Sequence, residues 1–128
     1  MSSRLPMFIA AMAAAVFVSL AAAAPAPACC IYNNTTLPLQ AQSYISGMHE
    51  WIVQPSTRKC TDATCGKEVT LCLVDALANQ AVSTHGKIWV SDRGWISVYK
   101  KSGGKWKVVS KTIDGSLHAT IYLEPQPK

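Results

Sequence analysis

Five cysteines carry the clearest chemistry in this sequence, and all of them lie before residue 73: Cys29, Cys30, Cys60, Cys65 and Cys72. Two disulfides with one leftover thiol are the simplest outcome, although the sequence alone leaves the pairing open. Because a bridge between adjacent cysteines is strained, we favour Cys60 with Cys65, and one of Cys29 or Cys30 with Cys72. The alternative is zinc held by the last three cysteines together with His49 or His85.

Histidines offer acid–base chemistry, the second kind of reaction that these residue types could support. A small secreted ribonuclease would need a set such as His49, Glu50, Arg93 and His118. The sequence contains no HExxH, no GxSxG, no glycine-rich phosphate loop and no carboxylate pair at an informative spacing. We therefore expect no catalytic site, no metal and no cofactor, and we keep a secreted hydrolase as the alternative.

The first 28 residues indicate the compartment in which the thiols are placed. Residues 1–4 carry one positive charge, residues 5–24 are almost wholly apolar, and residues 21–28 are small. This pattern predicts a secretory signal peptide cleaved between residues 22 and 28; a retained membrane anchor or a lipidated Cys29 are alternatives. Residues 29–128 would then form one secreted extracellular domain with no transmembrane segment. Disulfides prevail over zinc in that oxidising environment.

The elements that must position these residues read as strands. Seven short runs are rich in Val, Ile, Thr, Trp or Tyr: residues 30–36, 48–53, 69–74, 87–91, 95–100, 105–112 and 117–123. Such runs predict an all-β fold, a small disulfide-stabilised antiparallel β-sandwich of about seven strands whose last four form a meander. Residues 73–82 fit a short helix as well as a strand and loop. The proline-containing tail, residues 124–128, is expected to fray.

Strand alternation sorts the aromatic residues from the core. Ile88, Val90, Ile96 and Val98 are expected to face inward, as are residues 117, 119, 121 and 123. The side chains expected to face outward are Trp89, Trp95, Tyr99, His118 and Tyr122, with Lys87, Lys101, Lys105, Lys107 and Lys111 sharing or bordering that face. Either a loop covers these rings, or they form an open platform for sugars, an anionic polymer or a membrane surface.

The hairpin of residues 100–111 contains five lysines and no acidic residue. It is either a soluble edge protected by charge or an adhesive surface for anionic glycans, cell-wall polymers or lipid headgroups. We expect a non-enzymatic, effector-like binding protein whose partner is one of those ligands or a host protein. Nucleic acid is not expected, because no nucleic-acid motif is present.

Two further features concern the N-terminal strand. Asn33 and Asn34 lie in overlapping N-glycosylation sequons. Residues 31–35, with Trp51 and Pro55 after them, resemble the first hairpin of the thaumatin-like secreted β-sandwich proteins. Five cysteines fall short of that family's disulfide complement, so the resemblance implies a fold class and no residue roles.

Overall fold

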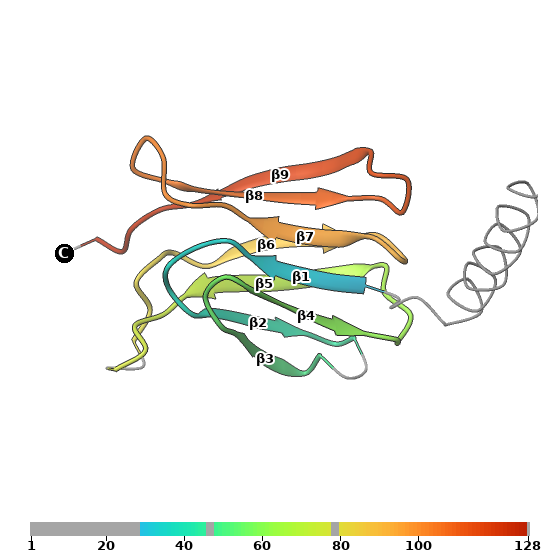
Figure 1. Ribbon diagram of the computed structural model, residues 1–128, viewed down its shortest axis with the longest axis horizontal. Coiled ribbons are helices and arrows are strands. Elements are labelled where there is room, and N and C mark those ends of the chain that lie inside the picture. Colours follow the sequence, from blue (N-terminus) through green and yellow to red (C-terminus); the bar gives the residue numbers. More distant parts are fainter. Residues whose placement is uncertain (1–28, 46–47, 78–79, 128) are drawn as a thin grey trace, which may run out of the picture.

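The computed structural model describes residues 29–45, 48–77 and 80–127, which form two packed β-sheets (Figure 1). The predicted signal peptide lies outside the described residues. The strands are β1 (Cys29–Asn33), β2 (Leu39–Ser43), β3 (Glu50–Val53), β4 (Thr57–Thr61), β5 (Lys67–Leu73), β6 (Gly86–Val90), β7 (Trp95–Val98), β8 (Trp106–Lys111) and β9 (Leu117–Leu123). The predicted all-β sandwich is confirmed, with β2 and β4 as strands additional to the seven expected.

The strands are arranged as a five-stranded sheet, in the order β4-β1-β7-β8-β9, and a four-stranded sheet, in the order β3-β2-β5-β6. The strand pairs are antiparallel, as expected for the sandwich, except for β1 and β7, which are parallel. The expected four-stranded meander is wrong. The observed meander contains only β7, β8 and β9, because β6 pairs with β5 in the other sheet.

The core lies between the two sheets and is filled mainly by alternate, inward-facing residues of the strands other than the exposed β4. The five-stranded sheet contributes Ile31, Ile96, Val98, Val108 and Leu123. The four-stranded sheet contributes Leu39, Val53, Val69, Leu71 and Val90. All ten side chains are at most 1% exposed, which is the packing expected where two sheets interdigitate about 10 Å apart.

The disulfides join Cys29 to Cys65 and Cys30 to Cys60, and Cys72 is free and buried. Two bridges and one thiol were expected, but the favoured pairing is wrong. The reason is the register: β1 pairs with β4 so that Cys30 lies directly opposite Cys60. Successive residues of a strand point to opposite faces, so Cys29 points into the core and reaches Cys65 there. The zinc alternative fails, since Cys60 and Cys65 are both bridged.

Residues 73–77 and 80–82 are a strand end and loop segments, so the helix alternative is wrong, and the described residues contain no helix. Leu73 ends β5, Val74 forms an isolated bridge with Ala81, and the Asp75 carboxylate accepts a hydrogen bond from the Leu77 N–H at 2.8 Å. Leu73 is fully buried while Leu77 is 99% exposed. The apolar residues at helical spacing therefore do not share a buried face.

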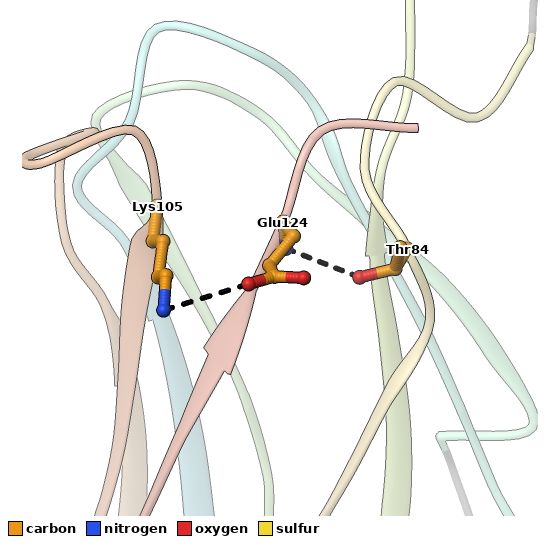
Figure 2. A network of polar contacts seen from close by, with 3 residues as sticks. All are labelled: Thr84, Lys105 and Glu124. Atoms are coloured by element: carbon orange, nitrogen blue, oxygen red, sulfur yellow. Dashed lines mark hydrogen bonds and ion pairs between the residues drawn. The ribbon is translucent and has the colours of Figure 1, made fainter. Parts of the chain in front are cut away.

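The C-terminal tail is anchored as far as Gln126, so the expected fraying is wrong for the described part of it. The Thr84 N–H donates to the Glu124 carbonyl at 2.7 Å, and the Gln126 N–H donates to the Val82 carbonyl at 2.9 Å. Pro125 lies between these bonds, opposite Ser83, where no N–H is needed. Figure 2 shows Glu124 between Thr84 and Lys105; the Thr84 hydroxyl accepts from the Glu124 N–H, and Lys105 Nζ lies 3.5 Å from the carboxylate.

Candidate functional site

The aromatic side chains expected to face outward do so. Trp89, Tyr99 and Tyr122 are 48%, 39% and 54% exposed, and Trp95 is half-buried. The inward expectation is wrong for Leu117, which is 64% exposed. The pairing of β8 with β9 shifts by one residue between Ser110 and Lys111, so that Lys111 lies opposite Leu117. Such a bulge turns the side chain of Leu117 to the outer face, on which Lys111 also lies.

These rings do not form one platform. Trp89 lies on β6 of the four-stranded sheet, whereas Trp95 and Tyr122 lie on β7 and β9 of the five-stranded sheet. Tyr99 directly follows β7 and continues its alternation. Because the two sheets pack face to face (Figure 1), their outer faces lie on opposite sides of the sandwich. The sequence-based platform is therefore two separate surfaces.

The first surface is the outer face of β7, β8 and β9, called here the basic face: Trp95, Tyr99, Lys105, Lys107, Lys111 and Tyr122. Lys107 lies between two rings, because it pairs with Tyr122 on β9 and its carbonyl accepts the Tyr99 N–H at 2.9 Å. Lys111 likewise lies between Trp95 and Leu117. Lys107 therefore has a ring on both sides, and Lys111 has a ring on one side and an aliphatic side chain on the other.

The lysines in and beside the basic face differ in the side chains that their ammonium groups contact. Lys105 lies 5.8 Å from the Tyr122 ring centre and forms the ion pair with Glu124. Lys101 lies 5.1 Å from the ring centre of Trp106, which is itself buried, so Lys101 covers the end of the sandwich and does not belong to the basic face. Within the described ranges, Lys107 and Lys111 have no ion-pair partner. Their ammonium groups are available to an external anion.

The second surface is a groove of about 680 Å³ on the outer face of the four-stranded sheet. Its lining residues are Gln42, Ser43, Tyr44, His49, Glu50, Lys67, Glu68, Thr70, Lys87 and Trp89. Trp89 could be placed on an outer face from the sequence, whereas Gln42, Tyr44 and Thr70 were not predicted as site residues. The alternation of apolar and polar residues from Leu39 to Gln42 is the signal that could have placed Gln42 on an outer face.

The structure does not bring the ribonuclease-like residues together. His49 and Glu50 line the groove on the four-stranded sheet. Arg93 lies in the turn between β6 and β7, with a positive φ of 59°, and His118 is exposed on β9 of the other sheet. General acid–base catalysis needs its groups within hydrogen-bond reach of one substrate, and this set is divided between two sheets.

The two sequon asparagines differ in access. Asn33 is buried, and its Nδ2, the atom that would carry a glycan, donates to the Leu37 carbonyl at 2.8 Å and the Val53 carbonyl at 2.9 Å. Asn34 is exposed. Of the two predicted acceptors, the fold leaves only Asn34 accessible to modification.

Among the described residues, two ionisable side chains have clearly shifted pKa values. Burial raises the pKa of the Cys72 thiol, which is 2% exposed. The hydrogen bond from the Thr112 hydroxyl, together with bonds from Ser116, lowers the pKa of Asp114 to about 2. Neither residue lines the basic face or the groove. In the part of the chain that the structure describes, no group of three His, Cys, Asp or Glu side chains could hold a metal ion.

No family model matches this chain, and no match was found among curated proteins or among solved structures. No helix of the described segments is long and apolar enough to cross a bilayer. The class of protein is therefore defined by its structure alone: the described segments form a nine-stranded β-sandwich with two disulfides, carrying a basic aromatic face and, on the opposite side, a polar groove.

Proposed function

We propose that this chain is a secreted, non-enzymatic protein that binds an anionic extracellular polymer, such as an acidic glycan or cell-wall polysaccharide, through the basic face. The observation that carries the proposal is the row formed by Tyr99, Lys107 and Tyr122, in which a lysine with no ion pair to any described residue lies between two exposed rings. Secretion is supported by the leader sequence and by two disulfides, which are typical of oxidising compartments.

Lysines and rings contribute to such binding in different ways. Ammonium groups attract an anionic polymer over a distance of about 10 Å at 0.1 M salt, and added salt screens this attraction. Aromatic rings offer an apolar face for stacking on a sugar ring, and added salt does not weaken that contact. An exposed tyrosine pair beside unpaired lysines therefore suits a ligand that has both a repeated negative charge and flat apolar faces.

The test compares charge removal on the two sides of the sandwich. Immobilised polygalacturonate is the probe, and its binding by residues 29–128 is measured at increasing salt. The double substitution Lys107→Gln with Lys111→Gln should weaken binding by about twofold to thirtyfold at low salt, since each exposed charge contributes roughly 0.2–1 kcal/mol. It should also flatten the salt dependence. The matched control, Lys67→Gln with Lys87→Gln, removes the same charge from the groove side and should have a smaller effect.

A ring variant completes the design. Tyr122→Ala should weaken binding at high as well as low salt, because stacking is not screened, and the ring is exposed enough for the variant to fold. Equal losses in the two lysine pairs would show that net charge alone governs adhesion. That result, or wild-type binding in both Lys107→Gln with Lys111→Gln and Tyr122→Ala, would contradict the proposal.

A further inference from the structure

We propose that the groove on the four-stranded sheet is a second binding site, which takes a neutral oligosaccharide. The first observation is a row of polar side chains that crosses all four strands. Gln42 on β2 lies opposite both Glu50 on β3 and Thr70 on β5, and Thr70 lies opposite Lys87 on β6. Neighbouring strands are about 4.8 Å apart, so this row presents polar groups at regular spacing along the groove.

The row combines donors and acceptors in the way that sugar hydroxyls require. A hydroxyl both donates and accepts, and the row offers an accepting carboxylate, an amide, a hydroxyl and a donating ammonium group. Gln40 Nε2 donates to Glu50 Oε1 at 3.0 Å, which orients the carboxylate. Among the described residues, the side chains of Gln42 and Thr70 have no hydrogen-bond partner. They are free to bind a ligand at the centre of the groove.

The charges of the groove favour an uncharged ligand. Lys67 and Lys87 are matched by Glu50 and Glu68 among the lining residues. This balance distinguishes the groove from the basic face, where Lys107 has no acidic partner among the residues that the structure describes. An anion in the groove would meet two carboxylates and a cation would meet two ammonium groups, so like charges oppose either kind of ion.

Two exposed rings lie beside the polar row, one on each side of β5. Tyr44 directly follows β2 and is 91% exposed, and Trp89 on β6 is 48% exposed. The strand between them is β5, so the two rings are separated by two strand spacings, about 10 Å. Rings held at that spacing beside polar groups suit stacking on separate sugar units of one chain.

The position of the groove argues against an extended peptide as its ligand. Peptides commonly add to a sheet edge, where unpaired backbone groups provide hydrogen bonds. The centre of the groove lies over β2 and β5, which are both inner strands with a partner on each side. A ligand there meets side chains only, which is how a carbohydrate is recognised on a sheet face.

The test uses a panel of neutral cello-, xylo-, manno- and chito-oligosaccharides, with amide chemical shifts and calorimetry as readouts. At least one member should shift the amide signals of Gln42, Thr70 and Trp89, and high salt should leave the affinity unchanged. Trp89→Ala should weaken that binding about tenfold or more. Thr70→Val, which keeps the shape and removes the hydroxyl, provides a second variant of the groove.

Controls on the other side separate this proposal from the proposed function. Tyr122→Ala and Lys107→Gln should leave neutral oligosaccharide binding unchanged, whatever their effect on the anionic polymer. A panel with no member that shifts groove signals would overturn the inference. So would binding that Lys107→Gln abolishes, or groove signals that respond only to the anionic polymer.

Discussion

The two disulfides close almost the same loop, and this predicts that their contributions to stability are not additive. Cys30 and Cys60 are 30 residues apart, and Cys29 and Cys65 are 36 apart. In the chain-entropy model, either bridge alone destabilises the unfolded state by about 4 kcal/mol at 25 °C. Once one is closed, the other closes a ring of only about eight residues, and it adds about 2.5 kcal/mol.

The prediction is tested by substituting the cysteines of each bridge separately and of both bridges together. Cys29→Ala with Cys65→Ala should lower the free energy of unfolding by about 2.5 kcal/mol, and Cys30→Ala with Cys60→Ala by a similar amount. Replacing all four should lower it by about 6 kcal/mol, which exceeds the sum of the two pairs by about 1 kcal/mol. Urea denaturation monitored by tryptophan fluorescence measures all three values.

Two points make the stability losses of these variants comparable. All variants carry Cys72→Ala, so that no free thiol can exchange with a remaining bridge, and the Cys72→Ala protein is the reference. Replacing the buried Cys29 and Cys65 also changes the packing around them, and this cost is the same in their double variant and in the quadruple variant. It therefore cancels when the losses of the two double variants are subtracted from the loss of the quadruple variant. Independent loops would instead give two losses of about 4 kcal/mol that simply add. That outcome would refute the nested-loop reasoning.

Three further predictions concern single positions. Cys72 should not react with a thiol reagent at pH 8 in native buffer, because burial raises its pKa, and should react fully in urea; stoichiometric native labelling would contradict this. Gly94→Ala should destabilise the protein by about 3 kcal/mol in thermal unfolding, since a Cβ there would lie 2.3 Å from the Lys111 carbonyl oxygen; Gly104→Asn, with open space around it, is the control. Asp114 has a pKa lowered from 3.8 to about 2, so its contribution to stability is present above pH 4 and is lost as the pH falls toward 2. The stability difference between the wild type and Asp114→Asn should shrink over that range, and a constant difference would count against the hydrogen-bonded turn.

Local patterns in the sequence predict most of the strands but not β2 and β4. Val, Ile, Trp and Tyr mark the seven expected runs. Leu39–Ser43 and Thr57–Thr61 contain few such residues and become strands because β1 and β5 offer them partners. Pairing between distant strands decides such segments, and a strand propensity is too weak to show it.

The same distinction applies to the candidate sites. Alternation correctly indicates that Trp89, Tyr99 and Tyr122 face outward, since that is a property of each strand alone. It cannot show that β6 and β7 belong to different sheets, and this separates Trp89 from the other rings. The disulfide pairing was mispredicted for a related reason: the register of β1 against β4 places Cys30 opposite Cys60, and register is a long-range property.

The place of β1 inside its sheet sets an order of events during synthesis. Its antiparallel neighbour β4 ends at Thr61, whereas its parallel neighbour β7 begins only at Trp95. A chain emerging from its N-terminal side therefore presents Cys60 and Cys65 well before the second half of the sheet exists. Oxidation at that stage would fix β1 and β4 as a preformed edge against which β7 docks. In a reduced chain, no bridge holds β1 beside β4 while the parallel pairing of β1 with the distant β7 forms. Refolding should therefore be slower from the reduced than from the oxidised protein.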